Sequence, residues 1–194
     1  MLQIVLATSN PHKVEEINAI TKDLGVEFVL PPEGFDPIED GETFEDNALI
    51  KAKEANRLTN MFSLADDSGL CVDALNGEPG IHSARYADTP SARIEKLLGA
   101  LKDVSHEKRT AKFVCAMTLL DKDGKVLFSD RGECYGNIGF EAKGINGFGY
   151  DPIFIVNGGD LTMAELSEDE KNKISHRAVA LGKVINFLSS YKND

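Results

Sequence analysis

The 194-residue chain lacks a long hydrophobic run. Its longest strongly apolar stretch, residues 113–120, falls far short of the ~20 residues that a helix needs to cross a bilayer. The first seven residues include no positively charged leader and only a short apolar stretch, so they do not resemble a signal peptide. From these absences we expect a cytoplasmic protein with no membrane partner.

Positive charge and cysteine are both scarce. Lysine and arginine number 21 against 32 aspartate and glutamate residues, which gives a formal net charge of −11. Proteins that coat nucleic-acid polymers need clustered cations, so we expect no polymer partner, although a few local cations and a metal could still hold a single nucleotide. The three cysteines, Cys71, Cys115 and Cys134, contain no Cys-x-x-Cys pair and are predicted to be reduced, mostly buried thiols.

Several catalytic signatures are also missing. The sequence contains no G-x-x-x-x-G-K-[ST] phosphate loop, no G-x-S-x-G nucleophile elbow, no H-E-x-x-H motif and no usable Cys–His nucleophile pattern. Covalent catalysis therefore has no candidate residue, whereas water activated by a carboxylate and a metal ion does. Apolar residues make up 42% of the chain, enough for a true core, and the length predicts one domain or two tightly joined lobes.

Hydrophobic periodicity predicts alternating strands and helices. Strands are expected at residues 4–6, 26–30, 62–65, 70–75, 112–120, 126–128 and 152–156. Helices are expected from Pro11 to Gly25, from Thr43 with Ala48, Ala52 and Ala55 as a small-residue face, over residues 94–101, and after a capping box at residues 167–170. The last helix should place Ile174, Ala178, Leu181, Val184, Ile185 and Leu188 on one side. The fold class is therefore α/β, with one extended sheet flanked by helices.

The first predicted strand-to-helix turn carries a lysine where a helix favours an acid. Asn10 is suited to be the N-cap and Pro11 the first helical residue, which places Lys13 in the positively polarised first turn. An anion held by the free N–H groups, Thr8, Asn10 and Lys13 would resolve this conflict. The alternative is a solvated lysine that costs about 0.3–1 kcal/mol, and the spacing alone leaves both interpretations open.

Carboxylates gather in two segments. The stretch at residues 39–46 has oxygen ligands for Mg²⁺, but without other support an acid-rich helix start that suits the helix dipole is the simpler interpretation. Asp66 and Asp67 follow an apolar strand and are expected to interrupt it, and adjacent carboxylates repel unless a metal, a cation or hydrogen bonds compensate. Open α/β sheets build their sites at the carboxyl ends of strands, which favours a functional role for the pair over an Asx turn.

Two further segments supply aromatic rings and hydrogen-bond donors. Residues 143–152 are glycine-rich and include Phe148 and Tyr150, either of which could stack on a flat ring or instead fill the core. The tripeptide Ser-His-Arg at 175–177, with Lys171 nearby, groups donors at a predicted helix start. A structural histidine and an ordinary surface ion pair are the alternatives.

In chain order, these segments resemble the Ham1-like inosine triphosphate pyrophosphatase family over nearly the whole chain. The resemblance is carried by LATSNPHK at 6–13, TFEDNA at 43–48 with KA at 51–52, ADDSGL at 65–70, PG at 79–80 with SARY at 83–86, FGYDP at 148–152 and ISHRA at 174–178. Each motif is weak alone, but their order is highly specific. Two positions depart from the family, which often has glutamate at the position of Asp46 and glycine at that of Asp88.

The resemblance implies a single domain over residues 1–194, with a mixed sheet flanked by helices, two lobes, a central substrate cleft and usually a homodimer. It also implies a Mg²⁺-dependent enzyme that hydrolyses non-standard purine nucleoside triphosphates (ITP, dITP and XTP) to the monophosphate and pyrophosphate, cleansing the nucleotide pool. The alternatives are a Maf-like pyrophosphatase with another base preference, which the Ser-His-Arg segment disfavours, and a non-catalytic nucleotide sensor, which the Asp66-Asp67 pair disfavours.

Motif positions carry the family's site residues onto this chain. Asp67 corresponds to the general base and a metal ligand, and Glu39 to the metal-binding glutamate, with Glu42 or Asp46 as alternatives because that loop varies in length. The triphosphate is assigned to Thr8, Ser9, Asn10 and Lys13, with Lys51 close by. A substrate contact is assigned to Ser68, and the base and sugar pocket to Phe148, Gly149, Tyr150, Asp151, Lys171, His176 and Arg177.

Base preference follows from donor chemistry. Donors at His176 and Arg177 match the 6-keto acceptor of inosine and xanthosine, and they leave groups unpaired against the 6-amino donor of adenine. Such a mismatch discriminates between substrates by up to ~10⁴-fold. Guanine shares the keto group, and the sequence identifies no residue that excludes it.

Overall fold

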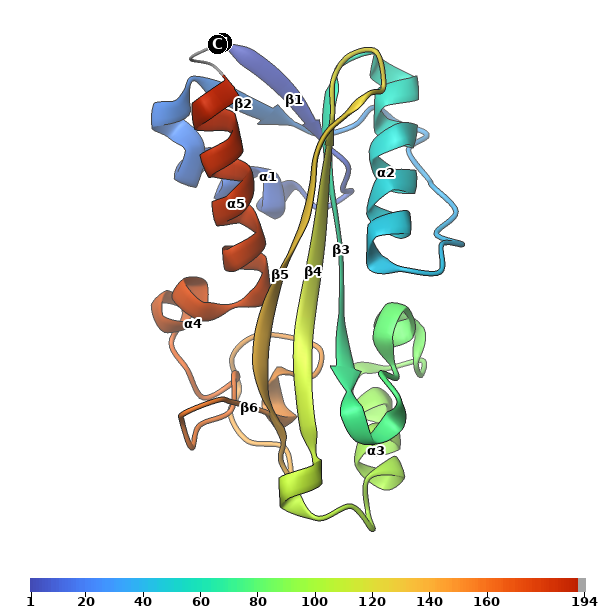
Figure 1. Cartoon of the computed structure of the whole chain (residues 1–194), viewed down its shortest axis with the longest axis vertical. Helices are drawn as coiled ribbons and strands as arrows, with labels where there is room; N and C mark the ends of the chain where they lie inside the picture. Colours follow the sequence, from blue (N-terminus) through green and yellow to red (C-terminus); the bar gives the residue numbers. More distant parts are fainter. Residues whose placement is uncertain (192–194) are drawn as a thin grey trace. The chain divides into compact units, whose positions relative to one another are not determined.

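A computed structural model describes residues 1–191, which form an α/β fold around one six-stranded sheet (Figure 1). The strand order is β2-β1-β3-β4-β5-β6. The strands are β1 (Leu2–Leu6), β2 (Val26–Val29), β3 (Phe62–Val72), β4 (Thr110–Leu120), β5 (Val126–Ile138) and β6 (Phe154–Val156). β1 runs parallel to β2 and β3, whereas β5 and β6 are antiparallel, so the sheet is mixed as expected.

Helices flank this sheet, and α1, α2 and α4 start at the predicted caps, whereas α3 starts four residues before the expected helix, behind a Thr89 cap. They are α1 (Pro11–Thr21), α2 (Phe44–Thr59), α3 (Pro90–Ala100), α4 (Glu168–Ile174) and α5 (His176–Tyr191). Asn10 caps α1, and Thr43 and Ser167 open α2 and α4 with capping boxes. α1 passes into a 3₁₀ turn that ends at Gly25, which adopts a left-handed φ of 59°. Among the described residues, no helix is both long and apolar enough to cross a membrane.

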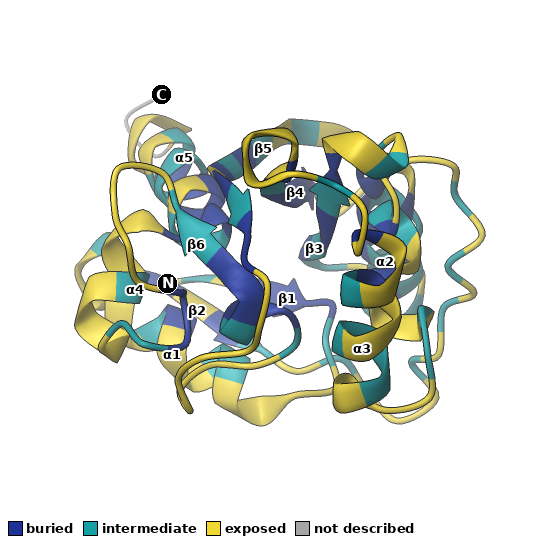
Figure 2. Cartoon of the chain, turned by 90° about the horizontal axis from the view of Figure 1, so that it is seen from below, coloured by how far each residue is buried: buried dark blue, intermediate teal, exposed yellow. Residues whose placement is uncertain are grey.

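The chain divides into two compact units, each with a hydrophobic core. Unit 1 comprises Met1–Asp67, Ala116–Arg131 and Ala180–Asp194, and unit 2 comprises Ser68–Cys115 and Gly132–Val179. The core of unit 1 includes Val5, Ala7, Ala52, Ala55, Ala65 and Leu120. The core of unit 2 includes Leu70, Leu97, Leu101, Ile138, Ile153 and Phe154. Figure 2 shows how buried residues concentrate on the strands, while much of the helical surface is exposed.

Small side chains let α2 approach the sheet of unit 1. Ala48, Ala52 and Ala55 recur on one side of the helix and are fully buried, as the sequence predicted. Ser63 of β3 is also buried, and its hydroxyl donates to the backbone carbonyl of Ala52 at 2.8 Å. Because this bond joins the strand directly to the helix backbone, larger side chains at these positions would force α2 outward.

The predicted interruption at residues 66–69 is wrong, because β3 continues through it. Successive side chains of a strand point to opposite faces, and α1 and α2 lie on either side of β3 in Figure 1. Asp66 pairs with Lys13 of α1, and Asp67 pairs with Lys51 of α2. Since each carboxylate has a cation on its own face, the chain stays extended where the residue types indicated a turn.

Other boundaries also differ from the prediction. β5 is much longer than the expected strand at 126–128. The strand expected at 152–156 begins only at Phe154, because Pro152 has no N–H for a strand ladder and Asp151–Ile153 forms a 3₁₀ turn. Ile174 does not join the apolar side of the last helix: it ends α4 and is 38% exposed, and the extended backbone of Ser175 separates α4 from α5.

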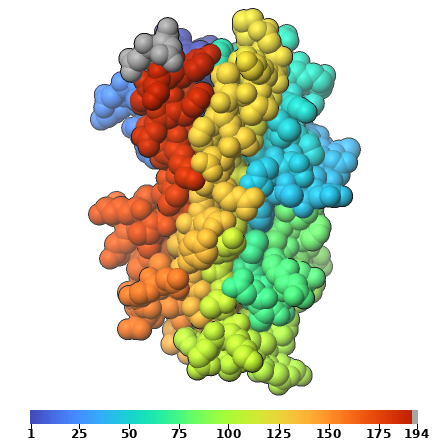
Figure 3. All heavy atoms as spheres, viewed as in Figure 1, coloured from blue at the N-terminus to red at the C-terminus, as the bar shows by residue number. Residues whose placement is uncertain are grey.

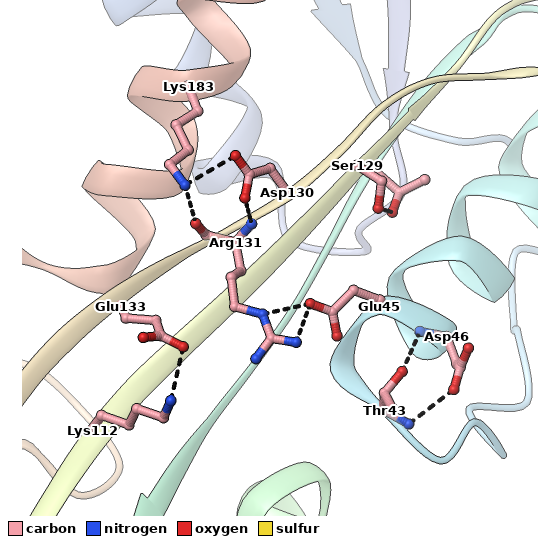
Figure 4. A network of polar contacts seen from close by, with 10 residues as sticks. Thr43, Glu45, Asp46, Lys112, Ser129, Asp130, Arg131, Glu133 and Lys183 are labelled. Carbon is pink, nitrogen blue, oxygen red and sulfur yellow. Dashed lines mark hydrogen bonds and ion pairs between the residues drawn. The ribbon is translucent and has the colours of Figure 1, made fainter.

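Ionic contacts join β5 to two helices within unit 1. The red α5 lies beside the yellow first part of β5 in Figure 3. Lys183 of α5 lies 3.0 Å from a carboxylate oxygen of Asp130 and donates to the backbone carbonyl of Arg131 at 2.7 Å (Figure 4). The contact with the second helix comes from the Arg131 side chain, whose Nε donates to Glu45 of α2 at 2.6 Å. The start of β5 is therefore bonded to both α2 and α5.

Arg109 is a buried cation in unit 2, with only 2% of its surface exposed. Its guanidinium donates to the backbone carbonyls of Leu101, Val104 and Gly139 at 2.7–3.0 Å. The ring of Phe140 covers the guanidinium carbon at 3.9 Å from the ring centre. Arg109 therefore ties the end of α3 to the segment that follows β5.

We expect Arg109→Met to lower the free energy of unfolding by about 3 kcal/mol, because three carbonyls lose their donor together. Guanidinium denaturation with an unchanged m-value would measure this loss. The control is Arg57→Met, which removes an exposed arginine that pairs with Glu54 one helical turn away and should hardly move the midpoint. Equal effects of the two substitutions would contradict the assigned role of Arg109.

Candidate active site

A lysine of α2 lies between two carboxylates of unit 1. Lys51 Nζ is 3.4 Å from Oδ1 of Asp67 on β3 and 3.3 Å from Oε2 of Glu39 in the loop before α2. The side chains of Lys51 and Asp67 are only 14% and 13% exposed. The structure therefore brings together three predicted site residues that are far apart in the sequence.

For both Asp67 and Lys51, burial and the charge of the partner side chain shift the pKa in opposite directions. Burial raises the pKa of Asp67 above its ordinary value, with Lys51 and Asn47 acting against the rise and Glu39 adding to it. Burial lowers the pKa of Lys51, but the nearby carboxylates outweigh burial and leave that pKa raised. Lys51 is therefore a cation at neutral pH. Asp67 has more affinity for a proton than a solvated aspartate, which suits a carboxylate that accepts a proton from water.

Asp66, the other carboxylate of the pair, holds Lys13 in the first turn of α1. Lys13 Nζ is 3.3 Å from both carboxylate oxygens of Asp66. The Asn10 side chain accepts a backbone N–H of α1 at 3.0 Å, and Thr8 Oγ1 accepts the N–H of Asn10 at 3.2 Å, with Ser9 exposed between them. A carboxylate thus compensates the lysine at the helix N-terminus, and an anion at this turn stays a prediction.

Three acids were candidates for the metal-binding glutamate or its substitute. Glu39 lies beside Lys51, which also contacts Asp67. Oδ2 of Asp46 instead accepts the N–H of Thr43 at 3.1 Å in the capping box (Figure 4), and Glu42 is exposed. The acid-rich helix start is therefore confirmed for Asp46, and Glu39 has the better placement for a metal ligand. Among residues 1–191, no group of three or more acids, histidines or cysteines is arranged to hold a metal by itself.

A buried carboxylate also organises the predicted base pocket of unit 2. Asp151 is 3% exposed, and its Oδ2 accepts from Lys171 Nζ at 2.5 Å and from the N–H of Phe148 at 2.8 Å. Gly147 has a φ of +75°, and a Cβ there would lie 2.2 Å from Asp151 Oδ2, so the loop needs glycine at this point. The sequence motif thus contains residues that build the loop as well as residues that face outward.

The two aromatic residues of this loop have different placements. Tyr150 is 4% exposed, packs in the core and donates its hydroxyl to the Ser83 carbonyl at 2.9 Å. Phe148 is 62% exposed, with Lys171 Nζ 4.7 Å and the Arg177 guanidinium carbon 5.8 Å from its ring centre. The core interpretation is therefore right for Tyr150, and Phe148 keeps a ring face available for stacking.

The remaining predicted residues of unit 2 lie at well-defined positions. His176 is 7% exposed, and its ring stacks on Phe113 with centroids 4.9 Å apart, as a structural histidine does. Gly149 has a φ of 60°, which favours glycine between the two aromatic residues. Ser68 Oγ is buried and, within residues 1–191, has no hydrogen-bond partner, so this hydroxyl is chemically suited to bond a ligand.

The sequence analysis did not identify Asn47 as a neighbour of Asp67, Lys51 and Glu39 in unit 1. Asn47 is 1% exposed and donates from Nδ2 to Asp67 Oδ2 at 3.2 Å. The signal was its spacing, because Asn47 precedes Lys51 by one helical turn and so shares its face. The pairing of Asp66 with Lys13 had no local signal, because these residues are 53 positions apart.

Together, the fold and these contacts define an α/β protein in which lysines of two helices pair with adjacent carboxylates of β3. The profile of the Ham1 family matches residues 4–187 of the chain. The protein therefore belongs to the Ham1 family, as the motifs predicted.

Named relatives match over nearly the whole length of both partners. A dITP/XTP pyrophosphatase from a Synechocystis species is 42% identical over 194 residues, which cover 100% of this chain and 99% of that protein. A dITP/XTP pyrophosphatase from Bacillus subtilis is 46% identical over 196 residues, which cover 98% of each protein. The structure of a HAM1 protein from Coxiella burnetii matches with a TM-score of 0.91 at 41% identity, covering 98% of this chain and 100% of that one.

Tyr150→Phe tests the core placement of that side chain through the pH dependence of stability. Burial raises the pKa of Tyr150 from 10.0 to about 12. The raised pKa stabilises the folded state fully below pH 10, and this contribution is lost as the pH rises towards 12, because the unfolded chain ionises first.

At pH 8 the variant should be less stable by about 1 kcal/mol, the typical value of a buried hydrogen bond. Between pH 8 and 11 the wild type should lose stability relative to the variant, so this difference should shrink or reverse. Guanidinium denaturation at both pH values measures it, and a constant difference would show that the hydroxyl is not buried.

Proposed function

We propose that this chain hydrolyses non-standard purine nucleoside triphosphates, namely ITP, dITP and XTP, to the monophosphate and pyrophosphate. Full-length relatives bear the name dITP/XTP pyrophosphatase. The observation that carries the proposal is the contact group of Asp67, Lys51 and Glu39. A carboxylate able to accept a proton, beside a cation that attracts phosphate, suits hydrolysis of a phosphoanhydride without a nucleophilic side chain.

The phosphate chemistry is assigned to unit 1. Asp67 orients a water molecule and accepts its proton as the water oxygen bonds to the α-phosphorus. The bond from this phosphorus to the bridging oxygen breaks, and pyrophosphate leaves with the electron pair. Lys13 and the N–H groups at the start of α1, with Thr8, Ser9 and Asn10, hold the departing pyrophosphate. Lys51 offsets negative charge on the phosphates.

The residues of this group fit a magnesium ion in their chemistry. Glu39 and Asp67 offer hard oxygen donors within 3.3–3.4 Å of the same lysine nitrogen. Mg²⁺ usually takes one or two carboxylates together with substrate phosphates. We therefore propose that Glu39 and Asp67 hold Mg²⁺, which when bound neutralises phosphate charge.

Base recognition is assigned to unit 2. The exposed ring of Phe148 offers a stacking face, and Lys171 and Arg177 near this ring supply donors for the 6-keto oxygen of hypoxanthine or xanthine. Asp151 orients Lys171 through their ion pair. Ser68 offers its buried hydroxyl as a further substrate contact. His176, Gly149 and Tyr150 support the pocket from their places in the fold.

We also propose that the enzyme works in the cytoplasm as a homodimer. In the described part of the chain no disulfide joins Cys71, Cys115 or Cys134, which suits a reducing compartment. The dimer is proposed from the family resemblance, and sedimentation equilibrium of the purified chain tests it directly.

We expect Asp67→Asn to lower kcat by at least about 100-fold while the protein stays folded, because the amide keeps the size of the carboxylate but accepts no proton. Pyrophosphate release at saturating ITP and Mg²⁺ measures the effect. The control is Asp130→Asn, which removes a carboxylate of unit 1 that pairs with Lys183 and should keep wild-type turnover. Near-normal turnover of Asp67→Asn would remove Asp67 from the role of base.

The pH profile gives a second readout of the same residue. Burial raises the pKa of Asp67, so wild-type kcat should decline as the pH falls through that raised value and the protonated carboxyl stops accepting protons. The residual activity of Asp67→Asn should lack this acid limb.

Pyrophosphate release from ITP, XTP, dITP, GTP, dTTP and ATP, each with and without Mg²⁺, tests the substrate class. We expect kcat/KM for ITP to exceed that for ATP, by a ratio that can reach about 10⁴, because the donor-lined pocket leaves groups unpaired against adenine. Arg177→Met should reduce this ratio chiefly by lowering kcat/KM for ITP. Equal values for ITP and ATP would contradict the base assignment, and tight binding without release would identify a sensor instead.

A further inference from the structure

Asn47 is a buried amide of unit 1 that is hydrogen-bonded at both its oxygen and its nitrogen. Only 1% of its surface is exposed, and it lies on α2 next to the buried Ala48. Its Oδ1 accepts the backbone N–H of Gly41 at 2.9 Å, and its Nδ2 donates to Oδ2 of Asp67 at 3.2 Å. A buried amide is retained at a cost unless both ends are bonded, and here the two bonds lead to different parts of the site.

These two bonds join the segments that carry the proposed metal ligands. Gly41 follows Glu39 by two residues, and Asp67 is the second carboxylate. A Cβ on Gly41 would lie 2.7 Å from Oδ1 of Asn47 and 2.6 Å from Cβ of Asp46, so glycine is needed for the loop to come this close to α2. The hydrogen bond from Gly41 N–H to Asn47 Oδ1 therefore needs both the glycine and the amide.

Lys51 cannot set the spacing of the carboxylates in the same way. Its contacts to Glu39 and Asp67 are 3.3 and 3.4 Å long and end on a flexible four-carbon stem. Asn47 has only two rotatable side-chain bonds, and on the side of the Glu39 loop it accepts the backbone N–H of Gly41 rather than contacting the mobile Glu39 carboxylate. The amide is thus the stiffer of the two links.

We infer that Asn47 is a positioning residue that fixes the spacing between Glu39 and Asp67 and thereby the affinity of this site for a divalent cation. The inference rests on the proposed function, because it takes these carboxylates as the ligands of Mg²⁺. Mg²⁺ demands near-ideal octahedral geometry, so a displaced ligand weakens its binding. Residues that orient metal ligands typically change metal affinity or activity by 10–100-fold, roughly, when they are removed.

The experiment compares Asn47→Ala with Asn56→Ala. Asn56 is also on α2, and its Nδ2 donates to the carbonyls of Met61 and Asp121 at 2.8 Å, so this half-buried amide is a control on the same helix whose bonds lead away from both carboxylates. Electron paramagnetic resonance measures Mn²⁺ binding to each protein in the presence of an α,β-methylene analogue of ITP. Steady-state kinetics gives the Mg²⁺ concentration for half-maximal turnover and the KM for ITP at saturating Mg²⁺.

For Asn47→Ala we expect Mn²⁺ affinity to fall and the half-maximal Mg²⁺ concentration to rise, each by roughly tenfold or more, with a much smaller change in KM for ITP. For Asn56→Ala we expect a lower unfolding temperature but wild-type metal binding. A folded Asn47→Ala protein with wild-type Mn²⁺ affinity would overturn the inference, and so would a loss of the same size in Asn56→Ala.

Gly41→Ala reaches the same contact from the loop, should Asn47→Ala fail to fold. We expect it to weaken Mn²⁺ binding as well, and the double variant with Asn47→Ala to be no weaker than the worse single variant, because both changes break one link. Fully additive losses would refute the shared contact. If the wild type binds Mn²⁺ but releases pyrophosphate from no nucleotide, the proposed function fails while the metal measurements still decide the role of Asn47.

Discussion

Adjacent carboxylates with little exposure to water need a partner each, and this requirement organises unit 1. Asp66 and Asp67 are 12% and 13% exposed and project to opposite faces of β3, where one cation cannot serve both. α1 therefore supplies Lys13 on one face, and α2 supplies Lys51 on the other. Asp66 thus places the N-terminus of α1, which would bind an anion. Asp67 places Lys51, which would offset phosphate charge.

The close approach of α2 follows from the same requirement. Lys51 and Asn47 reach Asp67 only because alanines on the inner side of the helix let its backbone lie near β3, where Ser63 bonds to Ala52. The loop before α2 is drawn in through Gly41, which brings Glu39 to the same lysine. A site of two carboxylates and a cation therefore depends on small residues that have no chemistry of their own.

Unit 2 uses a comparable arrangement for a different purpose. The buried carboxylate of Asp151 bonds Lys171 and the backbone of Phe148, so it fixes a cation next to an exposed aromatic ring. Tyr150 of the same motif points into the core and anchors the loop to Ser83. Residues of one short motif thus divide between building the loop and facing a ligand, which explains why the motif as a whole identifies the family better than any single residue identifies a role.

Features set by residues two to four positions apart could be predicted from the chain alone: the caps at Asn10, Thr43 and Ser167, and the alanine face of α2. The resemblance likewise named Asp67, Lys51 and Glu39 as residues of one site. The continuity of β3 and the link through Asn47 could not be read this way. The acidic pair stays in a strand because Asp66 has a partner 53 positions away, Lys13. Asn47 is buried because its amide bonds to Asp67, 20 positions away. The local residue types alone are compatible with a turn at the acidic pair and with an exposed amide.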